Sequence, residues 1–85
     1  MFKIIYSSQA VKTLLKIPRN TAKIIREKIN VLATDPYNTF LDAKKLQGRS
    51  GHRLRVGDWR IIYEIKNDEL IIIILKIASR GDVYK

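Results

Sequence analysis

The apolar residues of this chain repeat with two different periods, and the change of period divides the sequence. From Ala10 to Leu32 they recur every three or four residues, which is the spacing of one face of an α-helix. From His52 onward they alternate with polar residues or run together, as they do in β-strands. A chain of 85 residues has room for one domain. We therefore expect a single α+β domain over residues 1–85.

The first half of the chain predicts two helices. Ser7 or Ser8 can cap the first helix by accepting a hydrogen bond from a first-turn amide. Pro18 suits the first turn of the second helix, and Asp35-Pro36 ends it because the residue before a proline avoids helical angles. Two apolar stripes are expected to be buried: Ala10, Val11, Leu14 and Leu15 in the first helix, and Ala22, Ile25, Ile29 and Leu32, widened by Ile24 and Val31, in the second.

The second half predicts a small sheet. Residues 37–51 show no sustained period and are expected to form a loop, whereas Gly57-Asp58 is typical of a two-residue hairpin turn. The uninterrupted apolar run of residues 70–75 favours an inner strand that is buried on both faces. The expected strands cover residues 2–6, 52–56, 59–65 and 70–78. The order is thus β-α-α-β-β-β, a helical hairpin packed on a mainly antiparallel, twisted sheet.

The charge of the chain is strongly positive. It has 17 Lys and Arg against 8 Asp and Glu, a formal net charge of +9, and the excess lies in residues 1–60. Such a field attracts polyanions, so nucleic acid is the favoured partner, with an acidic protein surface as the alternative.

Cysteine and histidine content narrows the chemistry. With no cysteine and one histidine, disulfide scaffolds and thiolate metal sites are excluded, and we expect neither a metal nor a cofactor. The sequence shows no signal peptide and no apolar run of membrane-spanning length. We expect a cytoplasmic protein without a membrane partner.

Strand alternation gathers the arginines. Arg53 and Arg55 are two residues apart on one strand and share a face, and Arg60 can join them across the hairpin turn. Arg80, after the last strand, and Tyr84 can lie beside them. Guanidinium groups suit phosphate because their fork donates two parallel hydrogen bonds. The pattern therefore predicts an anion-binding face.

These residues resemble the RelE/ParE superfamily of toxins. The segment 45–48 followed by 52–65 is similar to the core of that superfamily, and residues 79–84 resemble its closing Arg-x-x-Val-Tyr element. The resemblance covers essentially the whole chain. It implies a toxin of a type II toxin–antitoxin system, which in RelE-like members cuts mRNA in the ribosomal A site and in ParE-like members poisons DNA gyrase.

The resemblance also implies roles for residues. Arg60 and Arg80 would stabilise negative charge on phosphoryl oxygens while a ribose 2′-OH attacks phosphorus, and Arg53 and Arg55 would position the RNA backbone or add to that stabilisation. Tyr84 would orient or deprotonate the 2′-OH.

Three further basic residues belong to the expected site, and the sequence differs from the RelE pattern at two places. Lys44, Lys45 and Arg49 are expected to contact RNA or rRNA. The RelE basic pair is usually lysine, whereas here it is arginine, and Ser79 stands where several ribonuclease relatives carry a catalytic histidine. His52 is expected to point away from the arginines.

The sequence thus predicts a metal-independent, ribosome-dependent mRNA endoribonuclease. Its expected partners are an acidic RelB-like antitoxin, mRNA on the ribosome and rRNA. Two alternatives stay open. A ParE-like inhibitor of DNA gyrase would share the fold without needing the catalytic residues, and a basic nucleic-acid-binding module would bind without cutting.

Overall fold

The computed structural model of the protein describes residues 1–79. This part of the chain forms two α-helices, five strands and one turn of 3-10 helix. The expected α+β class and element order are confirmed, with one short strand added after the helices. The elements are β1 (Lys3–Tyr6), α1 (Ser8–Lys16), α2 (Arg19–Thr34), β2 (Ala43–Lys45), β3 (His52–Val56), β4 (Trp59–Lys66), η1 (Asn67–Glu69) and β5 (Ile71–Ser79).

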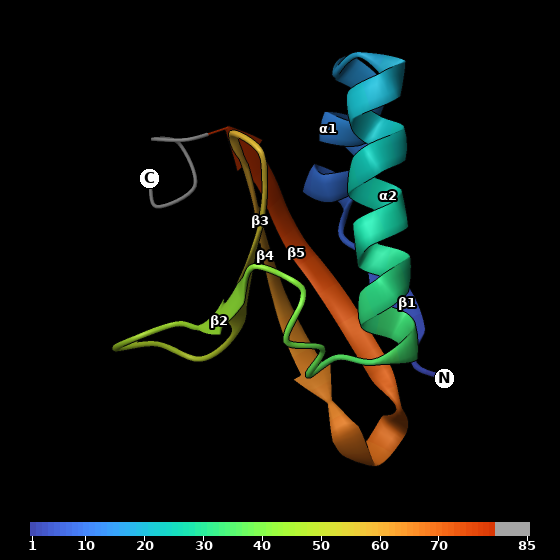
Figure 1. The fold of residues 1–85 in the computed structure, drawn as a ribbon. Helices are drawn as coiled ribbons and strands as arrows, with labels where there is room; N and C mark the ends of the chain where they lie inside the picture. Colours follow the sequence, from blue (N-terminus) through green and yellow to red (C-terminus); the bar gives the residue numbers. More distant parts are fainter. Residues whose placement is uncertain (80–85) are drawn as a thin grey trace.

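The sheet has the strand order β1-β5-β4-β3-β2. β1 runs parallel to β5 and the other three pairs are antiparallel, so the predicted mainly antiparallel sheet is confirmed. Figure 1 shows both helices on the same face of the sheet, while β2, the edge strand, and the loop after it lie away from the helices. Within residues 1–79, one face of the sheet is therefore left uncovered by helices. Neither described helix is long and apolar enough to cross a membrane.

The helix ends follow the predicted signals. Ser7 caps α1: its Oγ accepts a hydrogen bond from the Ala10 N–H at 3.1 Å and donates one to the Leu75 carbonyl at 2.8 Å. Pro18 stands at the N-cap of α2, and this helix ends at Thr34, before Asp35-Pro36. The serine thus ties α1 to β5 as well as starting the helix.

The core lies between the helices and the sheet, and it is narrower than predicted. Its helical members include Ala10, Leu14, Ala22, Ile25, Ile29 and Leu32, as expected, and Ala33 of α2 is buried as well. The expected burial of Val11, Leu15, Ile24 and Val31 is wrong, because these side chains are 43%, 76%, 48% and 38% exposed. Each helix contacts the small sheet along one stripe, so its flanking apolar residues face outward.

The prediction of a loop over residues 37–51 is wrong in its middle. Ala43–Lys45 forms β2 and pairs with His52–Leu54 of β3. The Leu46 N–H donates to the Gly51 carbonyl at 3.0 Å and closes this hairpin. A strand of three residues is too short to show a period of two, and pairing with β3 rather than local pattern holds it.

Strand β5 departs from regular alternation. Tyr63 pairs with Ile74 but Ile62 pairs with Lys76, so Leu75 is an extra residue, a β-bulge. The predicted burial of residues 70–75 on both faces is wrong, since Leu75 is 38% exposed and only Ile72 and Ile74 of this run are buried. After the bulge Ile77 is the buried residue, and Lys76 therefore belongs to the uncovered face.

Candidate functional site

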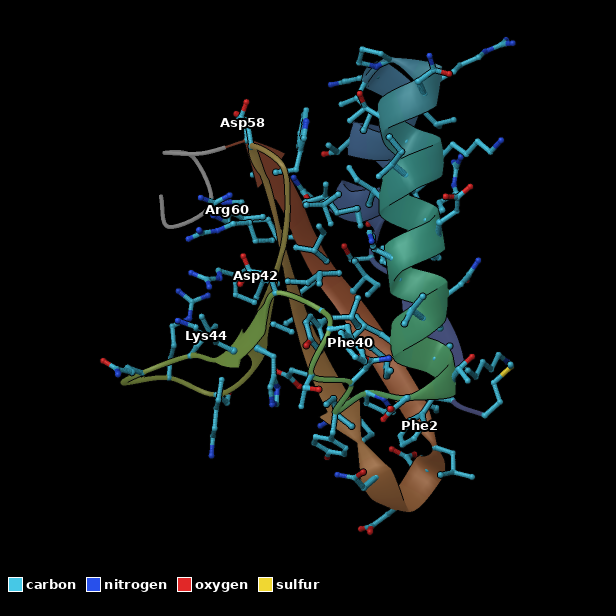
Figure 2. All side chains as sticks on the ribbon, viewed as in Figure 1. Phe2, Phe40, Asp42, Lys44, Asp58 and Arg60 are labelled. Atoms are coloured by element: carbon cyan, nitrogen blue, oxygen red, sulfur yellow. The ribbon has the colours of Figure 1, made fainter. Side chains whose placement is uncertain are left out.

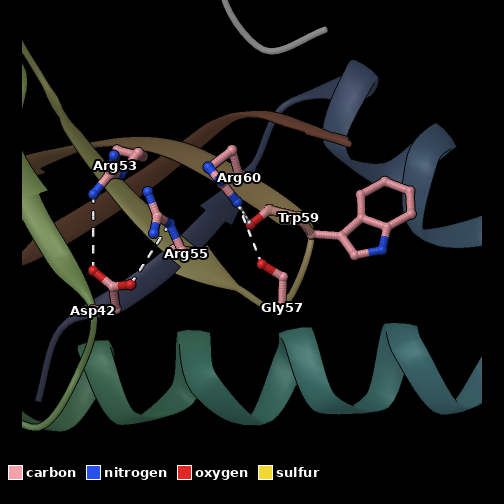
Figure 3. Close-up of polar contacts among 6 residues, drawn as sticks. All are labelled: Asp42, Arg53, Arg55, Gly57, Trp59 and Arg60. Carbon is pink, nitrogen blue, oxygen red and sulfur yellow. Dashed lines mark hydrogen bonds and ion pairs between the residues drawn. The ribbon is translucent and has the colours of Figure 1, made fainter. Parts of the chain in front are cut away.

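Three arginines share the face of the sheet that the helices leave open. Arg55 of β3 pairs with Arg60 of β4, and Arg53 lies two residues before Arg55. Residues paired across two strands point to the same face, so the predicted convergence of these three side chains is confirmed. Figure 2 shows Arg60 on the side away from the helices, and Figure 3 shows the three guanidinium groups beside one another. We call Arg53, Arg55 and Arg60 the arginine face.

A carboxylate lies against two of these arginines. Asp42 Oδ1 is 3.8 Å from Arg53 Nη2, and Oδ2 is 3.6 Å from Arg55 Nε (Figure 3). The Arg55 N–H also donates to the Asp42 carbonyl at 2.8 Å, which holds the backbone of Asp42 just before β2. Sequence reasoning missed Asp42 because its position depends on the pairing of β2 with β3. The signal available was a lone acidic residue within residues 37–51.

The electrostatic attraction within this cluster is weak. Both distances exceed hydrogen-bond length, and the side chains of Asp42 and Arg55 are 49% and 44% exposed. An exposed pair of this kind contributes about 0–1 kcal/mol. Arg53 differs, since its side chain is 16% exposed and its buried Nε–H has no hydrogen-bond partner within residues 1–79. A further anionic acceptor would therefore stabilise this guanidinium group.

Arg60 is anchored at the end of the β3–β4 hairpin. Its Nη1 donates to the carbonyls of Gly57 and Trp59 at 3.4 Å and 3.3 Å (Figure 3). The Trp59 indole leaves β4 on the opposite face, where it packs against the core. These contacts fix the orientation of a positive group before any ligand binds, which is what stabilisation of developing charge requires.

The bulge adds a lysine that sequence reasoning missed. Lys76 pairs with Ile62, and Ile62 pairs with Arg53, so the three residues form one row on the uncovered face. Lys44 of β2 pairs with Arg53 from the other side and extends the row to the sheet edge. Unbroken alternation along β5 would have turned Lys76 toward the helices, and the apolar run before it gives no sign of the bulge.

The predicted RNA-contacting residues lie together around a hollow. It measures about 390 Å³ and is lined by Lys44, Lys45, Leu46, Gln47, Arg49 and Arg53. Lys44 is in the row of Arg53, whereas Lys45 pairs with His52 and starts from the other face of β2. The hollow is a concave, basic surface that continues the arginine face toward β2.

The only histidine points away from the arginines, as predicted. The His52 ring stacks on the Tyr63 ring with centroids 5.4 Å apart. Burial lowers the pKa of His52, and the nearby Lys45 lowers it further. Burial, with a smaller effect of Tyr37, raises the pKa of Tyr63 to about 12. Both rings are therefore neutral at neutral pH and belong to the packing of the sheet.

Two predicted site residues lie outside the described part of the chain. Arg80 and Tyr84 follow Ser79, which ends β5 and pairs with Trp59. Their roles remain predictions.

Comparison with known proteins shows which class of protein this chain belongs to. The family model described as "ParE toxin of type II toxin-antitoxin system, parDE" matches residues 4–84. A toxin named RelE1 from Methanocaldococcus jannaschii is 34% identical over 86 residues, which cover 99% of this chain and 96% of that protein. The match is to the toxins of type II toxin–antitoxin systems. Within that class the chain belongs to the RelE/ParE family.

Solved structures agree with this assignment. The archaeal RelE–RelB complex from Pyrococcus horikoshii contains a chain with a TM-score of 0.83 and 29% identity, covering 96% of this chain and 98% of that one. The RelB–RelE antitoxin–toxin complex from Methanococcus jannaschii gives a TM-score of 0.76 and 28% identity, with 95% of each chain covered. The family resemblance and the fold predicted from the sequence are both confirmed.

Proposed function

We propose that this toxin is an endoribonuclease that cuts mRNA in the ribosomal A site and so inhibits translation in the cytoplasm. The observation that carries the proposal is the convergence of Arg53, Arg55 and Arg60 on a sheet face that neither α1 nor α2 covers. Guanidinium groups match the geometry of phosphate oxygens. The similarity to a protein named RelE1 supports the RelE-like branch.

The proposed reaction is attack of the ribose 2′-oxygen on the adjacent phosphorus. The new O2′–P bond forms as the P–O5′ bond breaks, the 2′-OH gives up its proton and the 5′-oxygen gains one. Arg60, oriented by the carbonyls of the hairpin, is suited to stabilise charge on the phosphoryl oxygens. Arg53 and Arg55 are suited to hold the RNA backbone. The proposal includes no metal and no cofactor.

Proton transfer falls to a group other than arginine, which stays protonated in proteins. By the family resemblance we assign Tyr84 to orient or deprotonate the 2′-OH and Arg80 to add a cation. Lys44, Lys45 and Arg49 would contact the backbone of mRNA or rRNA from the hollow beside Arg53. With so few proton carriers, the ribosome would supply the in-line geometry, and free RNA would be cut poorly.

The proposed protein partner is an acidic, RelB-like antitoxin. The similar structures are complexes of RelE with RelB. In this chain the exposed apolar side chains Val11 and Leu15 of α1 and Ile24 and Val31 of α2 offer an apolar surface to such a partner. An acidic segment that folds on binding would cover this surface and complement the net charge of +9.

The test is primer extension on an mRNA translated in a purified system. Wild type is compared with Arg60→Ala, with a reaction lacking ribosomes, and with Arg26→Ala, which removes the same charge from the exposed side of α2. We expect cuts inside the reading frame only when ribosomes are present. Arg60→Ala should reduce the cutting rate by about 100-fold or more, and Arg26→Ala should leave it unchanged.

The description of the matching family model favours one alternative, a ParE-like poison of DNA gyrase. A message left intact by the wild type would contradict the ribonuclease and lead to a gyrase supercoiling assay. Inhibition of supercoiling would establish the gyrase poison. RNA binding with neither effect would indicate a basic module that binds without cutting.

A further inference from the structure

We infer that Asp42 is an internal substitute for an RNA phosphate, holding Arg53 and Arg55 until RNA replaces its carboxylate. The identity of the anion rests on the proposed function, whereas the contact itself is a feature of the fold. Carboxylate and phosphate oxygens are both acceptors for charged guanidinium donors. A carboxylate seated between two arginines therefore marks a position where a phosphate can bind.

The geometry places one carboxylate across both side chains. The Asp42 Oδ1 lies 3.8 Å from Arg53 Nη2 and the Asp42 Oδ2 lies 3.6 Å from Arg55 Nε (Figure 3). Each oxygen is therefore paired with a different arginine. The two guanidinium groups start from alternate residues of β3 and face the same side. Asp42 thus bridges the groups that are proposed to hold the RNA backbone.

The contact of the Asp42 carboxylate with the two arginines is weak enough for a phosphate to replace it. Both oxygens lie beyond hydrogen-bond distance, and about half of the Asp42 side chain is exposed, 49%. The backbone of Asp42 is held separately, because its carbonyl accepts the Arg55 N–H at 2.8 Å. The side chain can rotate away from the arginines while β2 and β3 remain paired.

The arginines need a counter-charge when RNA is absent. Arg55 and Arg60 are directly paired across β3 and β4, and like charges in that arrangement repel each other. Arg53 carries a buried Nε–H that has no acceptor in the described part of the chain. Asp42 reduces the repulsion without filling the site, and an incoming phosphate must displace it.

The experiment measures binding of a 2′-O-methyl RNA oligonucleotide to the free toxin. This probe cannot be cut, because its 2′-oxygen carries no proton and cannot attack. The dissociation constant is measured for wild type, Asp42→Asn, Asp42→Glu and Asp68→Asn between about 50 and 200 mM salt. Asp68 is an exposed carboxylate in η1 that forms no ion pair within residues 1–79, so Asp68→Asn matches the charge change of Asp42→Asn.

Asp42→Asn should bind the probe about fivefold more tightly than wild type at low salt. Its slope of log Kd against log salt should be steeper than that of wild type, because salt screens the attraction by which the Asp42 carboxylate competes with phosphate for the arginines. Asp68→Asn should change the affinity by less than about twofold with no change of slope, because the Asp68 carboxylate does not compete with phosphate for the arginines. Asp42→Glu, which keeps the carboxylate, should stay near wild type.

Equal affinities and slopes for Asp42→Asn and Asp68→Asn would overturn the inference, as would weaker binding by an Asp42→Asn protein that melts like wild type. Asp42→Ala repeats the comparison if the amide disturbs folding. The probe requires neither ribosomes nor cleavage. A toxin that cuts no mRNA yet shows the Asp42 effect would refute the proposed function and leave this inference standing.

Discussion

Replacing Tyr63 with phenylalanine should stabilise the protein at neutral pH, although it removes a polar group from the core. Tyr63 is 0% exposed, and its buried hydroxyl has no hydrogen-bond partner within residues 1–79. A buried hydroxyl left without a partner costs about 1–3 kcal/mol. Phenylalanine keeps the ring and its stacking on His52, while the small void left by the oxygen offsets part of the gain. We expect the free energy of unfolding to rise by about 1 kcal/mol.

The difference between the two proteins should grow at high pH. The pKa of Tyr63 is raised to about 12 in the folded state, chiefly by burial, whereas an unfolded tyrosine titrates near about 10. Below the unfolded value both states keep the proton and the group has no effect on the pH dependence. As the pH rises from about 10 to 12, the unfolded wild type loses its proton first, so wild type loses about 2 kcal/mol that the phenylalanine variant keeps.

Urea unfolding at neutral pH and across the alkaline range measures both effects, and tyrosinate absorbance follows the ionisation itself. Tyr37→Phe is the control, because Tyr37 is 63% exposed and its hydroxyl exchanges hydrogen bonds with the Asn67 side chain at 3.4 Å and 3.1 Å. That variant should lose up to about 1 kcal/mol. A Tyr63→Phe protein destabilised by more than about 1 kcal/mol would show that the hydroxyl has a partner and would refute the reasoning.

Three further substitutions test particular contacts. Ser7→Ala removes both the α1 cap and a hydrogen bond to β5 and should cost about 2 kcal/mol in urea unfolding, whereas Ser8→Ala should cost under about 0.5 kcal/mol; equal losses would contradict the cap. Gly51 has φ +102°, and an added Cβ would lie 3.2 Å from a β4 carbonyl, so Gly51→Ala should lower the melting temperature more than Gly48→Ala, whose Cβ would meet nothing within 4 Å. Lys76→Gln should reduce the salt slope of RNA binding by about 0.7, and an unchanged slope would show that Lys76 makes no phosphate contact.

The sequence was enough to predict the arginine face because strand alternation and the length of the hairpin turn together determine where these side chains lie. Arg53 and Arg55 alternate with the buried Leu54, which fixes the face of β3. The two-residue turn after Val56 fixes the register, so Arg60 pairs with Arg55. Local periodicity and turn length suffice to place a side chain when both strands of a hairpin follow them.

Two parts of the site depend on pairing that local pattern does not encode. The run of isoleucines before Leu75 contains no polar residue that would show which face of the strand is exposed. The bulge that places Lys76 on the face of the arginines therefore cannot be predicted from the sequence pattern. Strand β2 is three residues long, and only its pairing with β3 brings Asp42 to Arg53. Both features are properties of the assembled sheet.

The positions of the strands show which basic residues could serve only to protect the sheet edge and which call for a binding role. Lys44 and Lys45 lie on β2, an edge strand, where charged side chains also protect a sheet from pairing with other chains. Arg53 and Arg60 lie on β3 and β4, which are paired on both sides and need no such protection. Arg53 is moreover largely withdrawn from solvent, its side chain being 16% exposed. A positive charge on an inner strand is costly when the side chain is partly buried and a like charge lies beside it. An anionic ligand that binds these arginines would explain why they are there.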